Sequence, residues 1–222
     1  MNPVPLGGAV FYASLPDASE ACKELLIATL WDHFQATATP LWNHCRSSGR
    51  AACPIQLVSG LLGRPQLNLG EFRGPPISFS RGGGKIWAAL SGDEADVGID
   101  VAGSADFEGA YPFQRVFHPE ELLHAVKLTD GDREEAAALL WSVKEAVVKA
   151  LGCGFYLVEP RHISVYPAAE GEGGYTFPVG LSGKALARFP LASGQFHPVH
   201  SLLQGKMWLS IAVINRRPVV HE

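Results

Sequence analysis

The stretch DREEAAALLWSVKEAVVKALG, residues 132–152, is the most informative segment of the chain. Asp132 followed three residues later by Glu135 is typical of a capped helix start, and Gly152 is typical of a helix end. Between them the residues are mostly apolar or strong helix formers. The stretch therefore predicts a long helix that packs against a core.

Two charged residues in the second half of this helix allow two interpretations. Glu145 and Lys149 are four residues apart with the acid first, which is the favourable order for an ordinary ion pair on a helix surface. Against that reading, Trp141 lies one turn before Glu145 on the same face. A carboxylate beside an indole indicates partial burial, where a charge needs a partner or a metal ion.

A short apolar run upstream, ADVGID at 95–100, predicts a buried strand that ends in Asp100. If Asp100 and Glu145 meet, they bring two carboxylates together beside Lys144 and Lys149. Carboxylate oxygens suit Mg²⁺, and ammonium groups neutralise phosphate. This combination of residue types is expected in a Mg²⁺-phosphate site.

The remaining pattern mixes helices and strands. Amphipathic helices are predicted over 18–36 and 119–128, and PISFSRGGGKIWAAL at 76–90 predicts a β-hairpin with its turn at the glycines. Later strands are expected at HISVYP, near 175–179, and at 207–214. Because there is no strict strand–helix–strand rhythm, we expect an α+β fold. The softest boundary lies near 103–111, which divides the chain into 1–103 and 104–222.

Composition excludes several classes of protein. The 222 residues are 47% hydrophobic and 18% charged, with a mean hydropathy of +0.09, so disorder is not expected. The formal charge of −4 argues against a general nucleic-acid binder. No apolar run is long enough to span a membrane, and the start of the chain lacks a basic secretory signal. The four cysteines form no CxxC pair. We therefore expect a cytoplasmic protein with free thiols.

At this point the motifs become recognisable, because VGID at 97–100 and WSVKEAVVKALG at 141–152 resemble the signature of the 4'-phosphopantetheinyl transferases. RVFHPEE at 115–121, GRP at 63–65 and PISFSRGG at 76–83 are similar to other segments of that family. The resemblance runs from about 60 to 165, and the first 55 residues are too divergent to be placed relative to the family. With this chain length, it is to the larger monomeric type with two similar lobes and the active site between them.

The resemblance implies a reaction in which coenzyme A donates its 4'-phosphopantetheine arm to a serine of an apo acyl or peptidyl carrier protein. Adenosine 3',5'-bisphosphate is released. By the same resemblance Asp100 and Glu145 would bind Mg²⁺, and Glu145 would take the serine proton directly or through a water. Lys144 and Lys149 would offset charge on the phosphate.

Further contacts to coenzyme A follow from the resemblance. Arg64 in the GRP turn would contact the phosphates on the adenosine side, and Ser78 and Ser80 of the hairpin would approach coenzyme A or a metal-bound water. Additional candidates for phosphate contacts are Arg46, Arg50 and Arg81, and the alternative for each is a solvated surface arginine.

The chain departs from the family at two positions. Phe79 stands where the family has a histidine that contacts phosphate, and a phenyl ring donates no hydrogen bond. Ala102 replaces a third carboxylate found in many members. The alternative function is therefore a catalytically impaired relative that binds coenzyme A or a carrier protein. Phe113 and Phe117 could form an apolar pad for a carrier helix or pack into the core.

Overall fold

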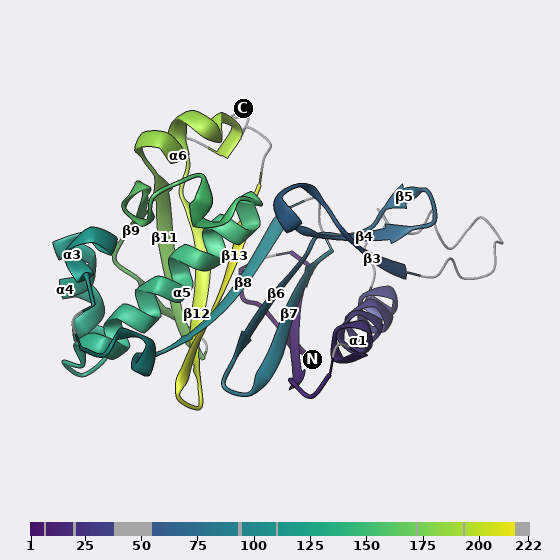
Figure 1. Ribbon diagram of the computed structural model, residues 1–222, viewed down its shortest axis with the longest axis horizontal. Helices are drawn as coiled ribbons and strands as arrows, with labels where there is room; N and C mark the ends of the chain where they lie inside the picture. Colours follow the sequence, from purple (N-terminus) through teal and green to yellow (C-terminus); the bar gives the residue numbers. More distant parts are fainter. Residues whose placement is uncertain are drawn as a thin grey trace.

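The computed structural model describes residues 1–6, 8–19, 21–37, 55–92, 95–109, 111–171, 173–192 and 194–215. It has a mixed α+β fold, as the sequence predicts (Figure 1). The helices are α1 (Ala21–Thr37), α3 (Phe113–Val116), α4 (Pro119–Leu128), α5 (Arg133–Leu151) and α6 (Gly183–Arg188). None of the helices in these ranges is both long and apolar enough to cross a membrane.

The described residues form three antiparallel sheets, whose strands are β1 (Asn2–Pro3), β2 (Val10–Pro16), β3 (Ile55–Ser59), β4 (Pro65–Leu69), β5 (Phe72–Arg73), β6 (Ile77–Gly82), β7 (Lys85–Ser91), β8 (Asp96–Gly103), β9 (Ile163–Val165), β10 (Ala169–Gly171), β11 (Gly174–Leu181), β12 (His197–Gln204) and β13 (Met207–Ile214). One sheet has the order β1-β2-β7-β6, and a second has the order β3-β4-β5. The third has the order β10-β11-β12-β13-β8, with β9 also paired to β11.

Strand β8 has different neighbours on its two faces. Its odd-numbered residues, such as Ile99, pack with Leu209 and Ile211 of β13 against β2 and β7 of the four-stranded sheet. Its even-numbered residues face α5, which lies across the large sheet (Figure 1). All eight residues of β8 are buried as a result. Strand β8, which carries Asp100, therefore lies between α5 and the four-stranded sheet.

Gly98 explains how closely α5 approaches this strand. A Cβ atom at that position would lie 1.9 Å from the carbonyl oxygen of Ala146 and 2.6 Å from the amide nitrogen of Ala150. Both atoms belong to the backbone of α5, so only a residue without a side chain fits beneath the helix. The glycine of the VGID segment therefore sets the distance between β8 and α5.

The main predicted elements are confirmed, with shifted ends. The long helix starts at Asp132, whose Oδ1 accepts a 2.8 Å hydrogen bond from the amide of Glu135. It ends at Gly152 in the left-handed conformation (φ 80°). The hairpin forms between β6 and β7, with positive φ at Gly83 and Gly84. The helix expected over 18–36 is found as α1 from Ala21. Strand β2 was missed.

Candidate functional site

Asp100, Lys149 and Ser80 form one hydrogen-bonded cluster. The Nζ of Lys149 lies 2.6 Å from Oδ1 of Asp100, and it also donates to the carbonyl of Ile99 at 3.2 Å and to Oγ of Ser80 at 3.3 Å. Ser80 donates to the same Asp100 oxygen at 2.9 Å. The carboxylate is 9% exposed and the lysine 28%. Three elements, β6, β8 and α5, therefore meet at one half-buried ion pair.

The two hairpin serines hold β6 against β8. Ser78 Oγ accepts a hydrogen bond from the amide of Ile99 at 3.1 Å, and Ser80 Oγ accepts one from the amide of Val101 at 3.3 Å. These amides point away from β13, which pairs with the other edge of β8. Strands β6 and β8 are not paired through backbone hydrogen bonds. The two serine hydroxyls therefore accept from β8 amides that would otherwise have no partner on this edge.

Glu145 completes a pair of carboxylates. Burial raises the pKa of Glu145, the nearby Asp100 carboxylate raises it further, and Lys149 opposes both effects. Burial likewise raises the pKa of Asp100, against the ion pair with Lys149 and the hydrogen bond from Ser80. Asp100 thus opposes the ionisation of Glu145, which is the electrostatic setting that a bound cation would relieve.

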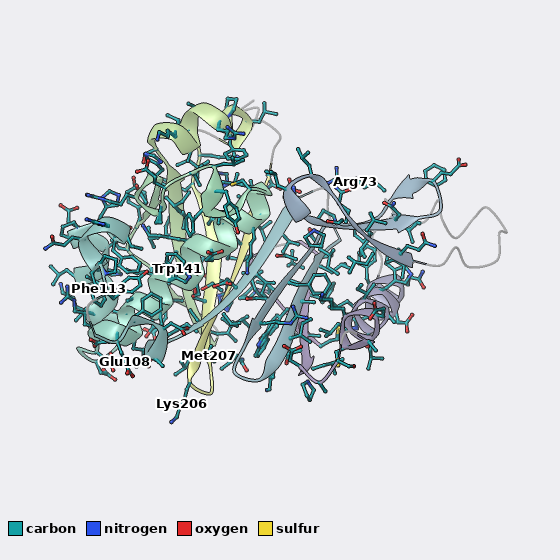
Figure 2. The ribbon with its side chains drawn as sticks, in the orientation of Figure 1. Arg73, Glu108, Phe113, Trp141, Lys206 and Met207 are labelled. Atoms are coloured by element: carbon teal, nitrogen blue, oxygen red, sulfur yellow. The ribbon has the colours of Figure 1, made fainter. Side chains whose placement is uncertain are left out.

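Two neighbouring hollows open beside this cluster. One, of about 430 Å³, contains the carboxylates, and its aromatic wall includes Phe107 and Trp141, the second of which is labelled in Figure 2. The other, of about 540 Å³, lies between the GRP turn, β3, β6 and the end of α5. Arg81 and Lys149 line both hollows. The basic side chains therefore stand where the two hollows meet.

Arg64 lines the larger hollow and is also bound to the protein. Its guanidinium forms an ion pair with Asp96 at the start of β8 and donates to the carbonyl of Ala150 at 3.2 Å. The turn places it there because Leu62 and Gly63 both adopt positive φ. Arg64 thus fixes the end of α5 in addition to lining the hollow.

Lys144 does not join the cluster, which corrects the expectation for this residue. Its side chain is 0% exposed and lies 2.6 Å from Oε1 of Glu121. It also donates to the carbonyls of Ile163 at 2.7 Å and Pro160 at 3.0 Å. Adjacent residues on a helix point about 100° apart, so Lys144 and Glu145 face different surroundings. Lys144 therefore ties α5 to α4 and β9 and lines neither hollow.

The other predicted residues have different surroundings. Phe79 is half-buried, packs against the core under α1 and lines the larger hollow. Arg81 reaches Asp17 at 3.0 Å with 47% of its side chain exposed. Arg46 and Arg50 lie outside the described residues. Of the two alternatives for Phe113 and Phe117, core packing is the one observed, because the two rings are 7% and 1% exposed and belong to the core.

Sequence reasoning missed several residues that support the site. Asp96 and Glu121 are the partners of Arg64 and Lys144, and Ser142 and Ser210 bond to each other beneath the cluster at 2.7 Å. A serine among the apolar residues of a buried helix was the available signal for Ser142. No local pattern marks Asp96 or Glu121, because their partners Arg64 and Lys144 are distant in sequence.

The residues of the cluster fit a magnesium ion that is shared with a phosphate ligand. Within the described ranges no group of three or more His, Cys, Asp or Glu side chains is arranged to hold a metal ion. Two carboxylates are nevertheless a usual protein contribution for Mg²⁺, which keeps several waters and takes further oxygens from substrate phosphates. The effect of Asp100 in raising the pKa of Glu145 agrees with this use.

Comparison with known proteins identifies the part of the chain that carries these residues. Residues 96–189 match the ACPS family, described as the 4'-phosphopantetheinyl transferase superfamily. The matched segment is less than half of the chain, and it includes Asp100, Glu145 and Lys149. No curated protein sequence matches the chain significantly.

Solved structures that match part of this chain include proteins of the following three organisms. The ACPS–CoA complex of Chronobacterium ammoniagenes is 23% identical, with a TM-score of 0.44 over 57% of this chain and 100% of that one. Holo-[acyl-carrier-protein] synthase of Neisseria meningitidis is 23% identical, with a TM-score of 0.41 over 54% and 97%. The Thermotoga maritima synthase is 21% identical, with a TM-score of 0.39 over 55% and 64%.

Proposed function

We propose that the protein transfers the 4'-phosphopantetheine arm of coenzyme A to a serine of an apo acyl or peptidyl carrier protein. The observation that carries this proposal is the convergence of Asp100, Glu145 and Lys149 at the junction of two hollows. All three residues lie in the segment that matches the transferase superfamily.

The larger hollow suits an elongated anion with apolar parts. Its described lining includes Lys23, Arg64, Arg81 and Lys149 and no acidic side chain, while Phe79 and other apolar residues cover much of its wall. Coenzyme A combines phosphates with a nucleoside and a flexible arm. We place its nucleotide in this hollow and its pyrophosphate beside Arg81 and Lys149, so that the reacting phosphorus faces the carboxylates.

In the proposed reaction, the carrier serine Oγ attacks the phosphorus that bears the pantetheine arm. The new Oγ–P bond replaces the bond to the bridging oxygen, which leaves as part of adenosine 3',5'-bisphosphate. Glu145, or a water that it orients, takes the serine proton. Lys149 offsets the charge that develops on the phosphate oxygens, as is usual for phosphoryl-type transfer.

Asp100 and Glu145 would hold Mg²⁺ at this site. A bound Mg²⁺ supplies charge neutralisation at the pyrophosphate. The cluster keeps Asp100 Oδ1 oriented through Ser80 and Lys149 before any ligand arrives. Lys144 has a different proposed role, because its buried contacts with Glu121 hold α5 in place.

We further propose that the chain is of the larger, monomeric, two-lobed type, with lobes at 1–103 and 104–222. The four-stranded sheet with α1 and the six-stranded sheet with α5 support two lobes, each built from a sheet and a long helix. Strand β8 lies between them and pairs with β13 of the second lobe. A size-exclusion measurement tests the monomeric state.

The direct test is intact-protein mass spectrometry of apo carrier proteins incubated with coenzyme A, Mg²⁺ and the protein. We expect one carrier to gain the mass of one phosphopantetheine, and Glu145→Ala to abolish the gain. The alternative is a binding relative that has lost catalysis, which the replacement of a family histidine by Phe79 favours. Coenzyme A binding in calorimetry without any gain on the organism's own carriers would support that alternative.

A further inference from the structure

Three buried serine hydroxyls form a continuous chain under α5. Ser142 Oγ lies 2.7 Å from Ser210 Oγ, and Ser201 Oγ lies 2.8 Å from Ser210 Oγ on its other side. Ser142 also donates to the carbonyl of Leu139 at 2.9 Å. All three serines are 0% exposed. The chain therefore crosses from β12 through β13 to the helix without contact with solvent.

The hydrogen bonds among these three serine hydroxyls all run in one direction. Each hydroxyl has a single proton. Because Ser142 uses its proton for Leu139, it accepts from Ser210, which in turn accepts from Ser201. The bond from Ser210 to Ser142 is consequently the link between sheet and helix. The bond from Ser201 supports Ser210 from within the sheet.

This link lies next to both carboxylates of the site. Ser210 is directly opposite Asp100 in the β13–β8 ladder, so the two side chains are neighbours on the face toward α5. Ser142 lies three residues before Glu145, which is about one helical turn. The Ser210–Ser142 bond thus connects a neighbour of one carboxylate to a neighbour of the other.

The interface between α5 and the sheet is mostly apolar, so the Ser142–Ser210 hydrogen bond is a directional contact within it. Around Ser142 the buried face of α5 consists of alanines, valines and leucines, including Leu139, Val143 and Ala146. Apolar contacts alone tolerate small shifts of a helix along a sheet. A buried hydroxyl that loses its partner is costly, so the serine pair penalises such shifts.

We propose that Ser142 and Ser210 are positioning residues that fix Glu145 relative to Asp100, whereas Ser201 contributes to stability only. This inference rests on the proposed function, because it assumes that the two carboxylates act together on a cation. Both serines are fully buried and neither lines a hollow. Their removal is expected to loosen the geometry of the carboxylate pair and leave the hollows intact.

The test compares Ser142→Ala with Ser201→Ala in the full chain. The two variants are matched, because each removes a fully buried hydroxyl that bonds to Ser210 at nearly the same distance. Thermal unfolding measures their effect on stability. Binding of Mn²⁺ in the presence of coenzyme A, followed by electron paramagnetic resonance, measures the carboxylate site without requiring turnover. Ser142→Thr, which keeps a hydroxyl, serves as the rescue.

We expect Ser142→Ala to weaken Mn²⁺ binding on the order of tenfold, the lower end of the effect of residues that orient metal ligands. Ser201→Ala should stay within about twofold of wild type, and Ser142→Thr should recover most of the affinity, by the same reasoning. Equal weakening by both alanine variants would overturn the inference, as would wild-type protein that binds no Mn²⁺.

The outcome is separable from that of the proposed function. If no carrier is modified but Ser142→Ala still weakens Mn²⁺ binding far more than Ser201→Ala, the positioning role stands and the transfer activity fails. If carriers are modified and the two variants bind Mn²⁺ alike, the activity stands and the positioning role fails.

Discussion

Replacing Gly98 by alanine is the sharpest structural test of the site. The added Cβ would lie 1.9 Å from the carbonyl oxygen of Ala146, whereas real Cβ atoms essentially never approach a neighbour within 3.0 Å. Helix α5 would therefore have to retreat from β8 by about 1.1 Å, the difference between these two distances. The obstructing atoms are backbone, so no side-chain rotation relieves the contact.

Both stability and activity should fall. Overpacking in a core usually costs about 1–3 kcal/mol, and a backbone collision belongs at the upper end. For a protein of this size, about 3 kcal/mol corresponds to a decrease in Tm of roughly 6–12 °C. A retreat of α5 also moves Glu145 and Lys149 away from Asp100. A misplacement of about 1 Å can cost about a hundredfold in rate.

The assay pairs thermal unfolding with the rate of carrier modification at a temperature where the variant is folded. Gly171→Ala is the matched control, because Gly171 also lies in a strand, has a negative or extended φ, and has no atom within 4 Å of an added Cβ. It should stay within about 1 kcal/mol of wild type. A Gly98→Ala variant with unchanged Tm and rate would refute the close-contact argument.

Three further predictions follow from individual contacts. Burial and the Asp100 carboxylate raise the pKa of Glu145, so ionisation of Glu145 destabilises the native state. In thermal scans without metal, Glu145→Gln should therefore have a higher Tm than wild type at pH 7. This difference in Tm should vanish below about pH 4.5, where Glu145 is protonated in both the folded and the unfolded state. A difference that grows at low pH would contradict the sign of this argument. Lys144→Met should lower the free energy of unfolding by about 3–5 kcal/mol in denaturant titrations, because it leaves the Glu121 carboxylate buried without its cation. An unchanged free energy of unfolding together with a raised KM for coenzyme A would instead assign Lys144 to the phosphate site. Phe79→His should tighten coenzyme A binding by up to about tenfold in calorimetry, the value of one added hydrogen bond. Unchanged affinity would indicate that Phe79 belongs to a differently built pocket.

Local patterns were sufficient to predict the secondary structure that carries the site. The cap at Asp132, the end at Gly152 and the turn at Gly83 and Gly84 are decided by interactions within a few residues, so they are readable from sequence. The two motifs also identified Asp100 and Lys149, whose contact the structure shows. Strand β2 was missed because its alternation is weak and a proline ends it.

The roles of individual charged side chains were decided by tertiary structure. Lys144 and Glu145 are adjacent in sequence, yet one is enclosed by Glu121 and backbone carbonyls and the other faces Asp100. Arg64 acquires Asp96 and the end of α5 as partners. The partners of these charges lie between 16 and 86 residues away.

The sequence by itself therefore determined the long helix, the hairpin and the residue types that they carry, because capping, turns and apolar periodicity are local. Only the packing of α5 on β8 decided which of those residues share a site. That packing depends on a glycine small enough to admit the helix and on buried polar pairs that form only at one position of the helix. Such long-range complementarity leaves no local pattern in the chain.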